Sequence, residues 1–229
     1  MYNNIALSQA QKQIVFGGLL GDASFHKRDN TFSFSHCQKQ KDYLLWKYSF
    51  FDDNQKSQIY ERIYEQGYVG YSFRTRVNHQ WDDLYSYLKH HLYSNTGRKK
   101  ISLKYLENID ELGLAVWWMD DGCLSIHKGN RWGKLCTEAF NYEEHILLQK
   151  YFKDKWKINV DIKQEKGKYY FIKLNVTALK RLFSLIYKYV VEVPCMIYKI
   201  DMAYQNNVAL GEYECAYKAI REYTNSLNI

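Results

Sequence analysis

The sequence predicts an α+β fold of two similar halves, because a helix–strand–strand–helix–strand–strand–helix order occurs twice along the chain. One apolar segment ends in an acidic residue at Asp22, and a second ends in Asp121, which lies 99 positions later (121 − 22). Lys100 and Lys199 each follow the acid of their own half by 78 positions (100 − 22 and 199 − 121). These matching offsets indicate a duplicated unit.

In the first half, helical and strand periods alternate. Phe32 and Phe34 alternate with serines, which is the period of a half-buried strand, whereas Leu84, Leu88 and Leu92 share one stripe of a helix. The first half is predicted to contain helices over 14–22, 41–51 and 81–92 and strands over 31–39 and 68–78.

The second half repeats this order. Asn141 with Glu144 three residues later is typical of a helix start, and Gly167 separates two alternating segments as a hairpin turn does. The predicted helices cover 112–121, 141–156 and 177–190, and the predicted strands cover 160–166 and 169–176. The predicted domain limits are 1–97 and 109–200 for the halves, 98–108 for a charged linker and 201–229 for a helical extension.

The composition excludes several classes of protein. With a mean hydropathy of −0.53 and no long apolar run, the 229-residue chain is not expected to be embedded in a membrane. The 5 cysteines are odd in number and form no C-x-x-C pair, which argues against a disulfide framework or a zinc ribbon and favours a reducing compartment. The N-terminal residues lack the features of a secretory signal, so we expect an intracellular protein.

The net charge of +7 makes nucleic acid the leading partner class, since a basic surface attracts polyanions. Net charge alone does not locate a binding patch, and a mildly basic surface without a nucleic-acid partner is equally compatible with it.

The end of the first apolar helix is the first candidate for chemistry. Gly17 and Gly21 lie one turn apart and would let a second helix backbone approach closely. If the repeated helices pair, Asp22 and Asp121 meet at helix C-termini, where like charges and the helix dipole oppose them. A divalent cation relieves that repulsion, and Asp120 adds a further oxygen ligand. Clusters of carboxylates suit Mg²⁺, Mn²⁺ or Ca²⁺, ions that can support phosphodiester hydrolysis.

The segments 17–23 (GGLLGDA) and 114–122 (LAVWWMDDG) resemble the two motifs of LAGLIDADG homing endonucleases. Similar resemblances are found at 36–44, 137–140 and 193–199, so that the likeness covers about residues 10–200. It implies a monomer of two pseudo-symmetric αββαββα halves, with the motif helices at their interface. Each half would carry a curved antiparallel sheet, and together the sheets would form a saddle over double-stranded DNA.

The resemblance also implies a chemistry: a metal-dependent, site-specific double-strand break in a long asymmetric target, leaving short 3′ overhangs. Mg²⁺ would be the cofactor, Mn²⁺ a substitute, and Ca²⁺ an ion that binds without supporting cleavage. Asp22 and Asp121 match the metal-binding catalytic acids, with Gly21 and Asp120 beside them in the metal site. Lys100 and Lys199 match basic residues near the attacked phosphates. The candidates for ordering water are His36, Gln38 and Glu138.

The strands offer a DNA-contacting face. In the strand over 68–78, Tyr71, Phe73, Thr75 and Val77 fall on an apolar face, opposite polar side chains that could read base edges in the major groove. A solvated face without a ligand is the alternative. The predicted DNA-contacting residues are Ser33, Ser35, Lys39, Ser72, Arg74, Arg76, Asn78, Arg131, Lys134, Lys163 and Lys173.

A non-cutting function on the same fold is the rival interpretation: an RNA-splicing maturase that binds intron RNA, or a DNA-binding regulator. The presence of both motif acids favours the endonuclease. The resemblance further implies a mobile-element protein, encoded in an organelle, bacterial or phage genome.

Overall fold

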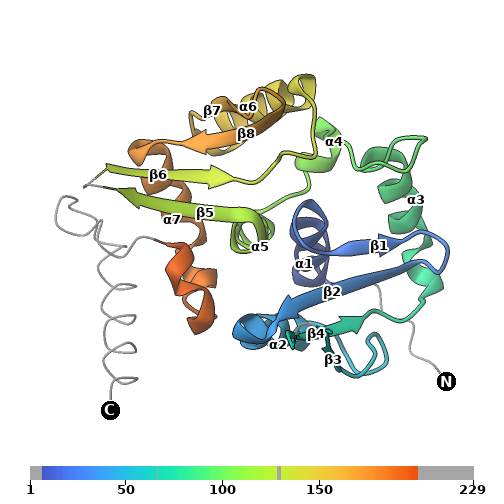
Figure 1. Cartoon of the computed structure of the whole chain (residues 1–229). Coiled ribbons are helices and arrows are strands. Elements are labelled where there is room, and N and C mark those ends of the chain that lie inside the picture. Colours follow the sequence, from blue (N-terminus) through green and yellow to red (C-terminus); the bar gives the residue numbers. More distant parts are fainter. Residues whose placement is uncertain (1–6, 66, 128–129, 201–229) are drawn as a thin grey trace, which may run out of the picture.

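The computed structural model describes residues 7–65, 67–127 and 130–200, and the predicted extension over 201–229 lies outside the described residues. Two four-stranded antiparallel sheets flank a central pair of helices (Figure 1). The strand orders are β1-β2-β4-β3 in one sheet and β5-β6-β8-β7 in the other, so each half builds its own sheet in the same order. The predicted two-half α+β fold is therefore confirmed.

The first half supplies three helices and one sheet. Its elements are α1 (Gln9–Leu20), β1 (Ser24–His26), β2 (Thr31–Cys37), the 3₁₀ helix η1 (Gln38–Gln40), α2 (Lys41–Ser49), β3 (Tyr60–Ile63), β4 (Val69–Arg74), the 3₁₀ helix η2 (His79–Trp81) and α3 (Asp82–His91). Phe32, Phe34 and Phe73 point from the sheet into the core, where they pack against other aromatic rings. The alternation of the sequence thus predicted the buried face correctly.

The second half has the same order after a short helix, α4 (Leu103–Leu106), which lies inside the predicted linker. Its elements are α5 (Glu111–Asp121), β5 (Gly122–His127), β6 (Asn130–Leu135), α6 (Tyr142–Trp156), β7 (Asp161–Glu165), β8 (Tyr169–Leu174), α7 (Val176–Val190) and the 3₁₀ helix η3 (Pro194–Lys199). Asn141 and Glu144 form the predicted capping box, in which each side chain accepts a hydrogen bond from the other residue's backbone N–H.

Helix α1 begins five residues earlier than predicted, because its first turns are polar but buried. Ser8 and Gln11 form a capping box. Gln13 is buried and reaches the second half, where its side chain donates to the Asn108 carbonyl at 2.7 Å and accepts from the Asp110 N–H at 2.9 Å. Hydrogen bonds therefore replace apolar contacts at this end of the helix, and apolar periodicity does not detect it.

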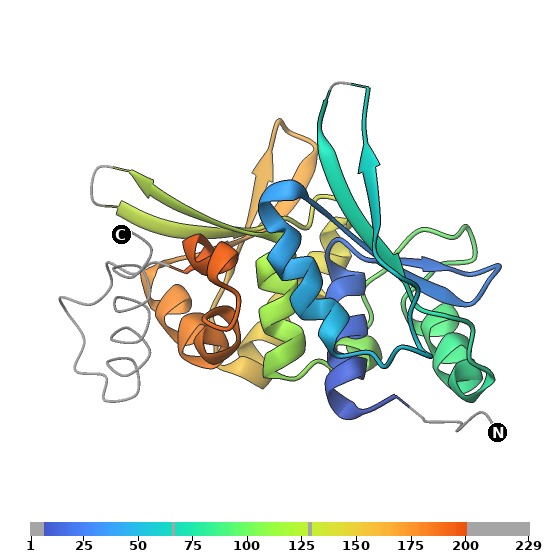
Figure 2. The ribbon, with the colours of Figure 1, turned by 90° about the horizontal axis from the view of Figure 1, so that it is seen from below.

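Helices α1 and α5 lie side by side at the centre of the molecule (Figure 2). Gly17 permits this closeness, because a Cβ there would overlap the Gly113 carbonyl oxygen and lie 2.9 Å from the Val116 Cβ. The close approach predicted from Gly17 and Gly21 is confirmed, and Gly113 is the partner that the sequence analysis did not identify. This pairing brings the C-terminal ends of both motif helices together.

Strand β4 is shorter than predicted and ends at Arg74. Thr75 leaves the ladder to form a bridge with Lys56, and the Asn78 side chain caps η2 by accepting from the Gln80 N–H. Val77 is 55% exposed and does not continue the apolar face. The prediction that Arg76, Val77 and Asn78 extend the two faces of this strand is therefore wrong.

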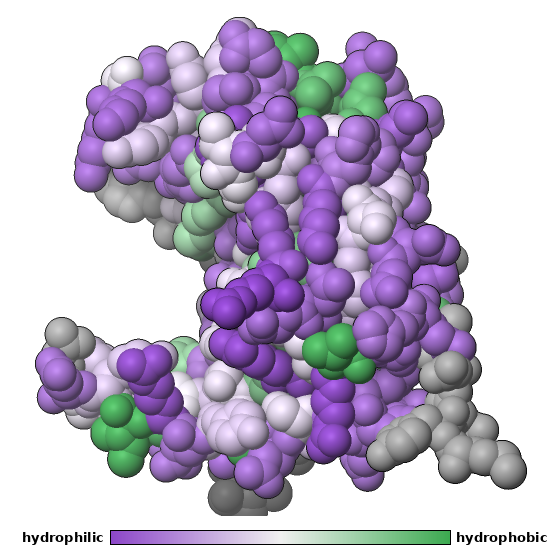
Figure 3. All heavy atoms as spheres, turned by 90° about the vertical axis from the view of Figure 1, so that its right-hand side faces the viewer, coloured by the Kyte–Doolittle hydropathy of each residue, from purple (hydrophilic) through white to green (hydrophobic). Residues whose placement is uncertain are grey.

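One side of the molecule is hollowed between an upper and a lower lobe, and hydrophilic side chains line much of that side (Figure 3). In the described part of the chain, none of the helices has both the length and the apolar character needed to cross a bilayer.

Candidate active site at the paired helix ends

The ends of α1 and α5 bring acidic side chains from both halves into contact. Gly21 caps α1 and has no side chain, so Asp120 from the last turn of α5 fills the space where a Cβ would be. The Asp120 Oδ2 accepts a hydrogen bond from the Asp22 backbone N–H at 3.2 Å. The Asp120 side chain is 0% exposed, whereas that of Asp22 is 47% exposed. Asp22 is therefore the acid that is open to solvent.

Burial and mutual repulsion disturb the ionisation of these acids. Burial, followed by the charges of Asp120 and Asp22, raises the pKa of Asp121 to about 7, and two nearby lysines only partly oppose this. Burial and the Asp120 carboxylate likewise raise the pKa of Asp22. Burial is the first cause of both shifts and the neighbouring carboxylates add to it, so a divalent cation bound between these acids would favour their charged forms.

One lysine from each half caps the end of the motif helix in its own half. Lys99 Nζ donates to the carbonyls of Gly21 and Ala23 at 3.3 and 3.2 Å. Lys199 Nζ donates to the carbonyls of Asp120 and Gly122 at 3.4 and 2.6 Å. These two sets of carbonyls are equivalent in the repeat, so Lys99 and Lys199 are structural counterparts.

The structure corrects the predicted pairing of Lys100 with Lys199. The backbone N–H of Lys100 donates to the carbonyl of Leu92, the residue that caps α3, at 2.8 Å, and the ammonium that contacts the end of α1 is that of Lys99. Lys99 follows Asp22 by 77 positions, whereas Lys199 follows Asp121 by 78. A constant offset of 78 from the acid therefore selected Lys100, the neighbour of Lys99.

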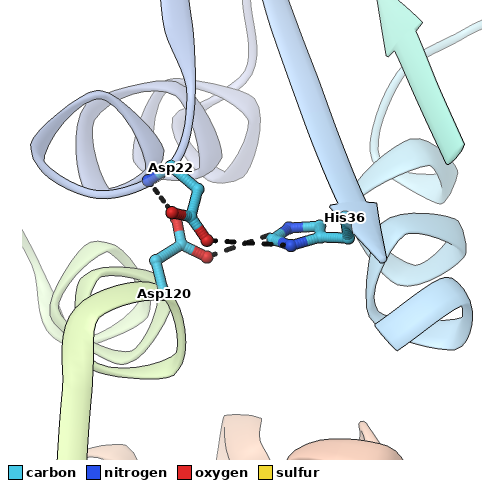
Figure 4. Close-up of side chains that lie close together, drawn as sticks. All are labelled: Asp22, His36 and Asp120. Atoms are coloured by element: carbon cyan, nitrogen blue, oxygen red, sulfur yellow. Dashed lines mark hydrogen bonds and ion pairs between the residues drawn. The ribbon is translucent and has the colours of Figure 1, made fainter. Parts of the chain in front are cut away.

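A third element, β2, contributes His36 to the acidic cluster (Figure 4). Each of Asp22, His36 and Asp120 offers one ligand atom, and these three atoms all lie within 4.8 Å of one another. His36 Nδ1 lies 3.8 Å from Asp22 Oδ2, and His36 Nε2 lies 3.9 Å from Asp120 Oδ1. His36, predicted to order water, is thus beside the acids.

Lys47 of α2 completes this cluster and was missed by the sequence analysis. Its ammonium lies 2.7 Å from Asp120 Oδ1 and 3.0 Å from His36 Nε2. A signal was present: Lys47 lies three residues after Leu44, on the stripe of α2 that is otherwise buried. A lysine at a core-facing position is unusual enough to indicate an internal partner.

The sequence matches the LAGLIDADG DNA endonuclease family over residues 12–182. The chain belongs to this family. A solved structure of the homing endonuclease I-WcaI bound to its DNA recognition sequence aligns with a TM-score of 0.71 and 25% identity, covering 86% of this chain and 88% of that one. The recognition made from the two motifs and their spacing is therefore confirmed.

Curated relatives of this LAGLIDADG protein include enzymes and longer proteins. DNA endonuclease I-ChuI of Chlamydomonas applanata is 26% identical over 176 residues, which cover 69% of this chain and 78% of that protein. Protein RecA of Mycolicibacterium flavescens is 28% identical over 172 residues, which cover 69% of this chain but only 38% of that protein. The chain thus spans less than half the length of the RecA proteins that it matches.

The outward faces of the two sheets carry several of the predicted contact residues of this LAGLIDADG protein. Ser33 pairs with Arg74 and Ser35 with Ser72 across β2 and β4, opposite the buried aromatic face. Lys39 is exposed in η1. The three serines and Arg74 line a pocket to which Arg62 and Tyr68 also contribute.

In the second sheet, Lys134 pairs with Lys173, and Lys163 lies on the same face opposite Phe171. Arg131 alternates with Lys134 along β6 and shares its side of the strand with Gly133 and Leu135. That side of β6 faces the core. Arg131 therefore lies on the other side of β6 from Lys134, and its role as a DNA contact stays a prediction.

Two further predicted residues have defined surroundings. Glu138 is ion-paired with Lys134 at 2.6 Å, and Glu165 holds the same ammonium at 2.8 Å. Gln38 begins η1 and is exposed. The charge of Lys134 is thus neutralised by two carboxylates, so this lysine is a weaker candidate for contact with phosphate than Arg74 of the first sheet.

Proposed function

We propose that this chain is a homing endonuclease that makes metal-dependent double-strand breaks in a long, asymmetric DNA target and leaves short 3′ overhangs. The observation that carries the proposal is the pairing of α1 with α5, which brings Asp22, Asp120 and Asp121 together between two lysine-capped helix ends. The family assignment and the relatives named as DNA endonucleases support the same activity.

The acids fit a divalent metal ion, for which we propose Mg²⁺, with Mn²⁺ as a substitute and Ca²⁺ as an ion that binds without supporting cleavage. Asp22 offers an exposed carboxylate, and Asp121 has a pKa raised to about 7 by burial and by the carboxylates of Asp120 and Asp22. When bound, such an ion supplies Lewis-acid and water-activating chemistry. The Gly21 carbonyl, also expected in the metal site, lies at the same helix end.

The chain's own cations have a separate role in this proposal. Lys99 and Lys199 each hold an ammonium at the end of a motif helix, where it can donate to phosphate oxygens as negative charge develops on them. Because an ammonium is a compact charge with three donors, each lysine can cap a helix carbonyl and still face a phosphate. One lysine per half corresponds to one cleaved strand per half.

The proposed partner is double-stranded DNA, bound by a monomer along the two sheet faces. Arg74 and the serines of the first sheet offer donors and acceptors suited to base edges, and Lys163 and Lys173 of the second sheet add positive charge. Because the two faces differ in side chains, the target read by one chain would be asymmetric.

The test is cleavage of a randomised or genomic DNA library in Mg²⁺, with sequencing of the ends. We expect defined double-strand ends with short 3′ overhangs from the wild type, and none or only nicks from Asp22→Asn and Asp121→Asn. Asp154→Asn, on the exposed surface of α6, is the matched control and should cut normally. Salt-dependent binding of DNA or RNA without metal-dependent ends would overturn the proposal in favour of a regulator or a maturase.

A further inference from the structure

Lys47 is fully buried and lies at the contact between the two halves. Its side chain is 0% exposed, and its ammonium pairs with Asp120, whose side chain is equally buried. The ring of Tyr43 lies 4.1 Å from the ammonium, and the Tyr43 hydroxyl donates to the Val116 carbonyl of α5 at 3.2 Å. The lysine is therefore enclosed by groups from both halves: Tyr43 of α2 and His36 of β2 from the first, and Asp120 of α5 from the second.

The contacts of Lys47 fix the hydrogen-bonding roles of its neighbours. An ammonium can only donate, so His36 Nε2, at 3.0 Å, must accept from it, and Nδ1 carries the ring proton. Nδ1 lies 3.8 Å from Asp22 Oδ2, beyond hydrogen-bonding distance, and the Gln40 side chain is a hydrogen-bond partner of the ring. Asp120 is similarly engaged through both oxygens, with Oδ1 on Lys47 and Oδ2 on the Asp22 N–H. His36 and Asp120 thus both contact Lys47, and both lie next to Asp22.

This arrangement occurs only once in the described part of the repeat. Matching the buried positions of α2 and α6 pairs Lys47 with Leu148, which is fully buried and apolar. The residue equivalent to Asp120 in the first half is Gly21, which has no side chain. Asp121 therefore has no counterpart of the ion pair that supports Asp22, and the two sides of the site are chemically unequal.

We propose that Lys47 is a positioning residue for Asp22: an internal cation that holds Asp120 and His36 in place, so that cleavage of one DNA strand depends on it more than cleavage of the other. The inference rests on the proposed endonuclease function. In this role Lys47 takes the position between Asp120 and His36 that their spacing would otherwise offer to a metal ion, and Asp120 serves as its counter-ion.

The ion pair itself is tested by unfolding the full-length protein in urea. Lys47→Met leaves a buried carboxylate without a partner, and we expect a lower midpoint than that of the wild type. Adding Asp120→Asn removes that charge, so the double variant should have a higher midpoint than Lys47→Met alone. If the double variant loses as much stability as the two single variants together, Lys47 and Asp120 do not form a stabilising ion pair.

The positioning role is tested by following the cleavage of each strand separately with end-labelled DNA. In the folded double variant we expect one strand to be cut about tenfold more slowly relative to the other than in the wild type, so that nicked DNA accumulates, as loss of about 1.4 kcal/mol from one side of the site would produce. The matched control is Lys56→Met, which removes another buried lysine of the same half. Its ammonium contacts the carbonyls of Tyr48 and Phe51 and the Asp53 carboxylate, away from the acids of the site.

Lys56→Met should lower stability without changing the strand ratio. If the double variant cuts both strands with the wild-type ratio, Lys47 is structural only and the inference fails. If the wild type cuts neither strand, the endonuclease proposal fails and the positioning role fails with it, while the urea experiment still decides the ion pair.

Discussion

Gly17 of α1 lies directly against Gly113 of α5, with no room for a side chain between the two backbones. A methyl group at position 17 would overlap the Gly113 carbonyl oxygen and force the helices apart. Because the acids of both halves extend from these helices, the separation of α1 and α5 controls both stability and the geometry of the site.

Gly17→Ala is expected to destabilise the protein by about 2–4 kcal/mol, since the clash involves backbone that cannot move aside cheaply. Gly18→Ala is the matched control: its methyl would lie 3.1 Å from Ala23 and 3.2 Å from Phe34, and the loss should be smaller. Chemical denaturation measures both. Equal stability of the two variants would contradict the close helix contact.

Lys99, and not Lys100, is expected to contribute to cleavage. Lys99→Met removes an ammonium at the cap of α1 and should slow cleavage by about 100-fold, the scale seen when one transition-state donor is lost. Lys100→Met is the natural control, with one lysine lost from the adjacent position, and should cut within about twofold of wild type. Rates from single-turnover cleavage at saturating protein, with DNA affinity measured separately, distinguish chemistry from binding. The reverse order of effects would restore Lys100 as the counterpart of Lys199.

Asp121 makes stability depend on pH in the absence of divalent metal. Its pKa is about 7 in the folded protein, against an ordinary value of 3.8, because of burial and the carboxylates of Asp120 and Asp22. Between about pH 4 and 7 the folded protein therefore binds a proton that the unfolded chain has released, so this contribution to stability falls as pH rises.

Asp121→Asn removes that dependence. The free energy of unfolding of the variant, relative to wild type, should rise across this window by on the order of 4 kcal/mol and stay level above it. Urea titrations in a chelating buffer at several pH values measure this difference, with Asp154→Asn as a control of constant offset. If the difference between Asp121→Asn and wild type does not vary with pH, the pKa of Asp121 is not raised in the folded protein.

Arg74 is expected to be a direct DNA contact of the first sheet. Arg74 lies on the outward face beside Ser33. Arg76 lies beyond the end of the strand, and the Nε of Arg76 donates to the Lys56 carbonyl. Arg74→Ala should weaken binding about tenfold and lower the slope of log affinity against log salt by about 1 if it neutralises a phosphate, or relax specificity at one base pair if it reads a base. Arg76→Ala should have the smaller effect. Fluorescence anisotropy at several salt concentrations compares them, and equal losses would contradict the assignment.

The order of the elements and the identity of the motif acids could be predicted from the sequence because both are local patterns. Periods of two and of 3.6 residues predicted the strands and helices, and Asp22 and Asp121 were identified from the repeat and the motifs. Strand ends were less predictable: at Thr75 and Asn78, a bridge and a cap from residues outside the strand ended the alternation.

What only the tertiary structure decided is which charged groups face one another. Lys47 lies 73 positions before Asp120, and its burial depends on α2 packing beside α5, a relationship that no pattern within either helix encodes. Whether Lys99 or Lys100 reaches the end of α1 depends on the path of the loop between α3 and α4. The sequence by itself determined a duplicated fold with an acid at the end of each motif helix, since apolar periodicity and sequence spacing are properties of the chain. The partners of those acids depend on distances in space, which are set when the two halves pack against each other.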